Sequence, residues 1–160
     1  MVPRNKIIEK LQTEGNKIIE LFSSFSSEDW KILIYSDKME WEVKDILSHF
    51  ISAERSFLSL FDNIRVNNKG TPEGFSIDEF NNSQVLKMKE IQNKELIELF
   101  KETRTNTINW FMTIPETDLD KIGKHPGMGE VKIIDMIKMI YLHNQMHLRE
   151  LILAVKDHKG

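Results

Sequence analysis

The segment IIDMIKMIYLHNQMHLRELILAVK, residues 133–156, decides the fold prediction, because its apolar side chains recur every three or four residues. That spacing gathers them on one side of an α-helix and predicts an amphipathic helix over Ile133–Lys156. His143 and His147 share this apolar side, about 40° apart around the helix axis. Because a buried imidazole is costly without partners, the pair is either hydrogen-bonded in the core or part of a metal site.

Three further segments have the same periodicity and predict helices: Arg4–Phe25, Val43–Phe61, and Ser76–Thr113 with a break near Asn93. Ser76 and Glu79 form a capping-box pattern at the start of the third segment, and Pro115 ends it because proline cannot continue a helix. Four amphipathic helices and no convincing strand predict an all-α four-helix bundle, with residues 1–160 as a single domain. The first and third connections are long enough to permit a crossover topology.

Composition limits the chemistry and the partners of the chain. The net charge of −3 leads us to expect no nucleic-acid partner. No cysteine is present, so a metal must be held by His, Asp or Glu, and a catalytic sulfur must come from another molecule. Without a long apolar run or a signal-peptide pattern at the start, we expect no membrane partner and a cytoplasmic location.

A third histidine strengthens the metal hypothesis. His49 lies on the apolar side of the predicted helix Val43–Phe61, flanked by Ile46 and Ala53. If that helix neighbours the last one, the imidazoles of His49, His143 and His147 can meet in the bundle interior. Three histidines leave one position of a tetrahedral ion open, which is typical of catalytic metal sites.

Glu150 is the candidate catalytic residue, because it lies on the same side of its helix as the two histidines. It can be a fourth ligand, a general base for metal-bound water, or a surface acid paired with Arg149 or Lys156. Acidic side chains form structural ion pairs more often than they bind metal or act in catalysis, which favours the last interpretation.

Three other residues near these segments have simpler expected roles. We expect Glu54 to be solvated or paired with Arg55, rather than to bind metal. For His125, in the segment HPGMG, a solvent-exposed loop position is favoured over a place at the mouth of the site. Trp41, before the His49 helix, is expected to be a core anchor.

Three stretches resemble one known family in the same order: WEVKDILSHFISAER (41–55), FNNSQV (80–85) and HPGMGEVKIIDMIKMIYLHNQMHLREL (125–151). Together they are similar to the DinB-like superfamily, also called the DinB/YfiT-like metalloenzymes. The resemblance covers nearly the whole chain. It implies a four-helix bundle and a metal triad of His49, His143 and His147. Family members include thiol-dependent transferases and isomerases that use bacillithiol, mycothiol or glutathione, while many others have no established activity.

The chain departs from the usual family pattern around the implied metal ligands. Glu42 and Lys132 stand where Ser or Thr commonly opens a helix, so both helix starts are expected to be less well capped. Asn144 replaces a common Asp, and Glu150 replaces a common Gln. These differences leave the three histidines intact but change the residues that surround them.

The leading functional hypothesis follows from this resemblance: a metal-dependent, thiol-dependent transferase that acts on small electrophiles in detoxification or stress. A second hypothesis is a metal-dependent hydrolase in which Glu150 is the base, and a third is a stress protein that binds a small molecule or metal without turnover. Zn or Ni are the expected metals after purification, and Fe or Mn are alternative working ions. The expected partners are a low-molecular-weight thiol, a small-molecule substrate and a second copy of the chain, in a homodimer.

Overall fold

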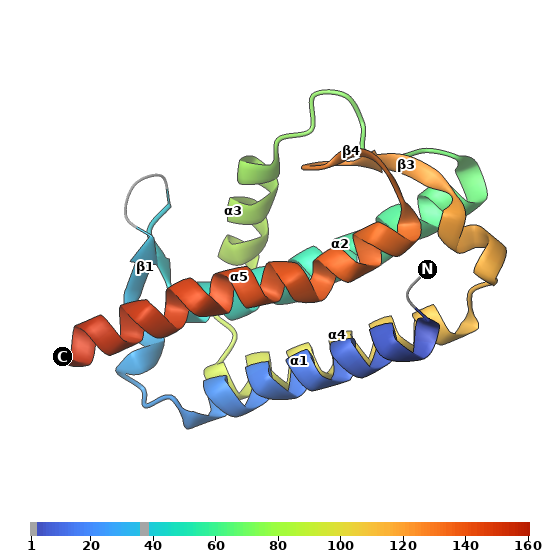
Figure 1. Cartoon of the computed structure of the whole chain (residues 1–160). Helices are drawn as coiled ribbons and strands as arrows, with labels where there is room; N and C mark the ends of the chain where they lie inside the picture. Colours follow the sequence, from blue (N-terminus) through green and yellow to red (C-terminus); the bar gives the residue numbers. More distant parts are fainter. Residues whose placement is uncertain (1–2, 36–38) are drawn as a thin grey trace.

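The computed structural model describes residues 3–35 and 39–160 and has four long helices packed as a bundle (Figure 1). These helices are α1 (Arg4–Ser24), α2 (Val43–Asn67), α4 (Asn93–Thr113) and α5 (Ile133–Lys159). The predicted all-α four-helix bundle is therefore confirmed. No helix within the described ranges is long and apolar enough to cross a bilayer.

Helices that follow each other in the chain are not always neighbours in the bundle. Among the four long helices, α1 and α2 each pack against α4 and α5. Figure 1 shows α1 and α5 running in one direction and α2 and α4 in the other. The chain therefore crosses the bundle diagonally from α1 to α2 and again from α4 to α5, the two connections that were long enough for a crossover.

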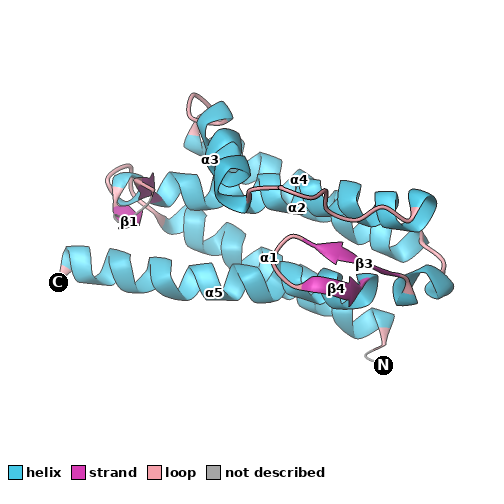
Figure 2. Ribbon diagram, turned by 90° about the horizontal axis from the view of Figure 1, so that it is seen from above, coloured by secondary structure: helices cyan, strands magenta, loops and turns pink. Residues whose placement is uncertain are grey.

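Two short hairpins lie in these diagonal connections. After the 3-10 turn Asp29–Lys31, β1 (Leu33–Tyr35) pairs antiparallel with β2 (Trp41–Glu42). After the turn Glu116–Asp120, β3 (Ile122–His125) pairs antiparallel with β4 (Gly129–Lys132), beside the start of α5 (Figure 2). The expectation of no strand was wrong in this detail, because each strand is too short to show a clear alternation of apolar and polar residues.

The predicted break in the third helical segment is real. A short helix, α3 (Ile77–Lys87), packs against α2, and α4 begins separately at Asn93. The Ser76 hydroxyl accepts a hydrogen bond from the Glu79 backbone N–H at 3.2 Å, as the capping pattern predicted. The helix α4 ends at Thr113, just before Pro115.

The helix α2 is longer than predicted. Its last turns extend past Phe61 to Asn67, because Ile64 is buried against the core although its sequence neighbours are polar. The helix ends where Asn68 takes a left-handed conformation with φ of 54°. Composition alone suggested a loop here, and a single buried side chain explains the difference.

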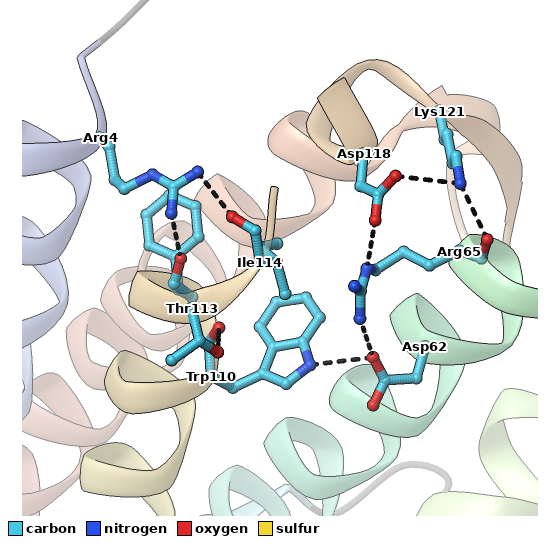
Figure 3. Close-up of polar contacts among 9 residues, drawn as sticks. Arg4, Asp62, Arg65, Trp110, Thr113, Ile114, Asp118 and Lys121 are labelled. Carbon is cyan, nitrogen blue, oxygen red and sulfur yellow. Dashed lines mark hydrogen bonds and ion pairs between the residues drawn. The ribbon is translucent and has the colours of Figure 1, made fainter. Parts of the chain in front are cut away.

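One end of the bundle is held together by polar contacts (Figure 3). Arg65 of α2 donates to Asp62 at 2.7 Å and to Asp118, after α4, at 2.9 Å. Trp110 of α4 also donates to Asp62, at 2.9 Å. Arg4 donates to carbonyl groups at the end of α4. These contacts fix the ends of three helices relative to one another and hold the base of the β3–β4 hairpin.

Candidate metal centre

The start of α2 is well fixed although it lacks the usual Ser or Thr. The Asp45 carboxylate accepts a hydrogen bond from the Glu42 backbone N–H at 2.9 Å and pairs with Lys89 at 2.8 Å. The expectation of a weaker helix start at Glu42 was therefore wrong, whereas Lys132 makes no side-chain cap at α5. His49 follows Asp45 by about one helical turn, so this cap fixes the part of α2 that bears the histidine.

The three predicted histidines meet between α2 and α5. The Nε2 atom of His143 lies 3.1 Å from Nε2 of His49 and 2.9 Å from Nε2 of His147. One ligand atom from each residue lies within 4.8 Å of the others. Nitrogens bound at 2.0–2.1 Å to a tetrahedral zinc ion are about 3.3 Å apart. The donor set and its spacing therefore fit a divalent metal ion that prefers imidazole ligands.

Burial keeps these imidazoles neutral at physiological pH. It lowers the pKa of His49 well below 6.5, and the neighbouring His143 and His147 lower it further. Burial, followed by the charges of His147 and His125, lowers the pKa of His143 to about 4. Burial also lowers the pKa of His147, an effect that the charge of Glu150 opposes. Neutral imidazoles have the free lone pairs that a cation needs.

Glu150 lies close enough to His147 to affect its pKa, but it is exposed on α5. Among the described residues, the cluster of potential ligands within 4.8 Å consists of His49, His143 and His147. The structure therefore brings the three histidines together and leaves the Glu150 carboxylate at their edge.

A buried polar network beside the histidines was missed by the sequence analysis. Glu54 is 2% exposed and accepts a hydrogen bond from Arg104 Nε at 2.6 Å, so the expectation that it is solvated or paired with Arg55 was wrong. Arg104 also donates to Asn144 Oδ1 and to the Leu11 carbonyl, both at 2.7 Å. Sequence periodicity could not distinguish a buried arginine in α4 from a surface one.

This network gives a physical reason for Asn144 in place of the usual Asp. The Arg104 guanidinium already has a buried carboxylate partner in Glu54. A second carboxylate at position 144 would bury two negative charges against one positive charge, which is unfavourable. The neutral Asn144 amide accepts the remaining hydrogen bond without that cost, and it fixes the turn of α5 that bears His143.

His125 is also placed differently from the expectation of a solvent-exposed loop. It is 8% exposed at the end of β3, and its ring stacks on Phe57 with centroids 5.3 Å apart. Its Nδ1 accepts hydrogen bonds from the backbone N–H groups of Gly127 and Met128 at 3.0 and 3.1 Å. Burial lowers its pKa below 6.5. The less favoured interpretation, a place at the mouth of the site, describes it better.

An apolar cavity of about 180 Å³ adjoins the histidine cluster. His49, His143 and His125 line it, together with Ala53, Ser56, Phe57, Phe75, Ile77, Phe80, Asn81, Pro126 and Gly127. A second cavity of about 210 Å³ shares Phe57, Phe75 and Phe80 with the first. The histidines are therefore accessible from a largely hydrophobic space between α2, α3 and the β3–β4 hairpin.

Trp41 packs against the histidine cluster as well as the core. It is buried, its ring centroid lies 5.1 Å from that of His49, and its Nε1 donates to Asn82 of α3 at 3.2 Å. The expected core anchor is confirmed. Its contacts also connect α3, which forms one wall of the cavity, to the imidazole of His49.

The DinB superfamily model matches residues 10–151, so the chain belongs to the DinB superfamily. No curated protein sequence matches it. YfiT from Bacillus subtilis, described as a probable metal-dependent hydrolase with an unusual four-helix bundle topology, has a similar structure. The TM-score is 0.78 at 11% identity, over 98% of this chain and 87% of YfiT.

Two other solved structures have the same fold. A mycothiol-dependent maleylpyruvate isomerase has a TM-score of 0.77 at 11% identity, and the match covers 94% of this chain but only 61% of the isomerase. The colibactin self-resistance protein ClbS, in complex with double-stranded DNA, has a TM-score of 0.74 at 14% identity, over 100% of this chain and 99% of ClbS.

The ClbS complex corrects one expectation from the sequence. A protein of this fold and size forms a complex with double-stranded DNA, so the net charge does not exclude a nucleic-acid partner, and the expectation that excluded one does not hold. The physical reason is that net charge sums over the whole surface, whereas binding depends on how charges are distributed locally.

Proposed function

We propose that this protein is a metal-dependent enzyme in which His49, His143 and His147 hold a divalent ion. The convergence of their Nε2 atoms supports this proposal most strongly. Zinc or nickel is expected after purification, because nitrogen-rich sites bind these ions well, and iron or manganese is an alternative working ion. When bound, the ion supplies a positive charge and an open position that can lower the pKa of a thiol or a water molecule.

The reaction we propose is group transfer between a low-molecular-weight thiol and a small electrophile. The chain has no cysteine, so the reacting sulfur must belong to a second molecule. The fold is shared with a mycothiol-dependent isomerase, which supports a thiol partner. The hydrophobic walls of the adjoining cavity suit an apolar electrophile.

The residues around the cluster would orient the imidazoles. Trp41 packs on the ring of His49, and Asn144, fixed by Arg104, precedes the turn that bears His147. These contacts reduce the freedom of the ligands before a metal or substrate binds, which favours a defined geometry.

Adduct formation between glutathione, bacillithiol or mycothiol and the fluorogenic electrophile monochlorobimane tests this proposal. We expect zinc-loaded protein to accelerate the reaction, a chelator to abolish the acceleration, and added zinc to restore it. His143→Ala should remove the acceleration, whereas His158→Ala, on the exposed end of α5, should retain it. An unchanged rate in a metal-free variant with all three cluster histidines changed to alanine would exclude the proposal.

A metal-dependent hydrolase is the second candidate, and the position of Glu150 beside His147 favours it. In this case the Glu150 carboxylate would accept a proton from the attacking water. Glu150→Gln should then abolish ester hydrolysis while the zinc content remains unchanged. If Glu150→Gln has no effect on hydrolysis, or if the wild type hydrolyses nothing, this candidate is rejected.

A further inference from the structure

The hydrogen bonds of His125 determine which of its ring nitrogens has the proton. Its Nδ1 accepts from two backbone N–H groups, those of Gly127 at 3.0 Å and Met128 at 3.1 Å. An accepting nitrogen must have a free lone pair, so the proton of the neutral ring is on Nε2. The turn between β3 and β4 therefore makes His125 a hydrogen-bond donor through Nε2.

That donor has no partner in the part of the chain that the structure describes. The Nε2 atom is buried and makes no hydrogen bond with any described residue. A buried donor without an acceptor is unfavourable, so the Nε2–H group calls for an acceptor that is not part of the described chain. Stacking on Phe57 holds the ring in place, so it cannot easily turn to seek another partner.

The position of His125 indicates where the acceptor would come from. Its ring lines the same cavity as His49 and His143. A molecule in that cavity can therefore contact His125 and the histidine cluster at the same time.

The other cavity walls limit the chemistry of this molecule. None of the described residues that line the cavity is a lysine, arginine, aspartate or glutamate. Away from the histidine cluster, a charged group of the ligand would lose its hydration without a counter-ion, which is costly. Phe57, Phe75 and Phe80 are well suited to contact an aromatic ring, and the volume of about 180 Å³ suits a compound with a single ring.

We propose that His125 is a substrate-binding residue that donates, through Nε2–H, to the carbonyl oxygen of a neutral, single-ring aromatic electrophile. This inference rests on the proposed function, because the histidine cluster is taken as the reacting end of the cavity. The hydrogen bond positions the carbonyl compound beside the cluster and draws electron density toward its oxygen. An electrophile without an acceptor would leave Nε2 unsatisfied and would bind more weakly.

Binding of two probes of similar shape tests the inference. Acetophenone has a carbonyl acceptor, whereas ethylbenzene does not, and NMR titration of the backbone amides gives both affinities. We expect the wild type to prefer acetophenone by about tenfold, the order of magnitude of one buried hydrogen bond. His125→Asn should reduce this preference, measured as the ratio of the two affinities in each protein, because the shorter asparagine side chain cannot place a donor where Nε2–H lies. Its Oδ1 can still accept from the Gly127 and Met128 N–H groups.

Two controls separate a local effect from misfolding. The amide resonances of Gly127 and Met128 in His125→Asn should retain their hydrogen-bonded positions, and Arg55→Ala, at an exposed position of α2 that lines neither cavity, should bind both probes as the wild type does. Equal affinities for the two probes in the wild type would overturn the inference, as would an undiminished preference in His125→Asn. Nitrogen NMR of the imidazole should find the proton on Nε2, and a proton on Nδ1 would also overturn it.

The titration is done on both zinc-loaded and metal-free protein, which distinguishes this inference from the proposed function. If the preference for acetophenone is present but the protein retains no metal, the ligand site stands and the metal-dependent function fails. If zinc is retained but the preference is absent, the role of His125 fails alone.

Discussion

Arg104 connects the helices around the candidate centre through the hydrogen bonds of a single side chain. It is buried, and three of its nitrogens donate to Glu54, Asn144 and the Leu11 carbonyl. Gly15 leaves room for it, since a Cβ at that position would lie 3.1 Å from Arg104 Nη1, a tight contact. The guanidinium therefore joins all four long helices at a point adjacent to His143.

Glu54→Gln should destabilise the protein by about 3–5 kcal/mol, because it leaves the buried Arg104 charge without its counter-ion. Urea unfolding measures this change in the free energy of unfolding. The matched control is Glu98→Gln, which removes an exposed partner of Lys101 and should cost less than about 1 kcal/mol. Similar losses in the two variants would show that the buried pair is not important for stability.

The histidine cluster predicts a pH dependence for the metal-free protein. The folded-state pKa values of His49, His143 and His147 all lie below the ordinary 6.5, that of His143 at about 4. At pH values between about 4 and 6.5, the unfolded chain therefore binds more protons than the folded chain. The free energy of unfolding consequently falls as pH decreases over this range.

Urea unfolding at several pH values measures this effect. His143→Ala removes one of the depressed groups, and it also relieves the charge effect on His49. Its free energy of unfolding should thus fall less steeply with decreasing pH than that of the wild type. If the free energy of unfolding falls equally steeply with decreasing pH in both proteins, the histidine cluster is not the cause of the pH dependence.

The sequence predicted some of these residues and missed others for definable reasons. His49, His143 and His147 could be found because histidines on apolar helix sides are unusual and their spacing is interpretable. Glu54 and Arg104 could not, since a buried ion pair joins residues far apart in the chain that look like ordinary surface charges. The burial of His125 depends on a hairpin that was not predicted.

At the scale of secondary-structure elements, the β3–β4 hairpin determines the shape of the cavity. The loop after α2 packs on its edge, where Thr71 N–H donates to the Lys124 carbonyl at 2.9 Å. Gly70 lies so close to this strand that a Cβ would overlap the backbone nitrogen of Lys124. The hairpin in turn places His125 against Phe57 of α2.

Gly70→Ala should therefore displace the hairpin and alter the surroundings of His125. We expect a loss of stability of about 1–3 kcal/mol from this overpacking, together with shifts of the Gly127 and Met128 amide resonances in NMR spectra. Lys69→Ala, at the exposed neighbouring position, is the control and should change neither. A Gly70→Ala variant with wild-type stability and spectrum would contradict this role of the loop.

Long elements were easier to predict than short ones. The four long helices and the break before α4 followed from periodicity, because an apolar stripe over several turns has few alternative explanations. The end of α2 at Asn67 was missed since polar composition concealed the buried Ile64. The hairpins have strands of four residues or fewer, which is too short for their pattern to be distinguished from a loop.

At the scale of the whole molecule, the candidate centre joins helices from different parts of the chain. His49 is contributed by α2, and His143 and His147 by α5, which packs against α2. The sequence was compatible with a crossover topology but could not select it over a simple up-and-down arrangement, because helix periodicity gives no information on which helices are neighbours. That residues 1–160 form one independently folding domain stays a prediction.

A metal that binds at this centre should stabilise the folded chain, since the unfolded chain does not hold the three histidines together. Free zinc at 100 times its dissociation constant should add about 2.7 kcal/mol to the free energy of unfolding. Thermal unfolding followed by circular dichroism, with and without zinc, measures the effect. His158→Ala should be stabilised like the wild type, whereas a similar stabilisation of His143→Ala would indicate that zinc binds elsewhere.

The central claim is that His49, His143 and His147 together form a metal site. The most direct measurement is the metal content per chain, by elemental analysis, of wild type, His143→Ala and His158→Ala purified after growth in metal-replete medium. We predict about one divalent ion per chain in the wild type and in His158→Ala, and a large loss in His143→Ala. Equal, near-zero metal in all three proteins would contradict the claim and would leave the cluster as a set of buried core histidines.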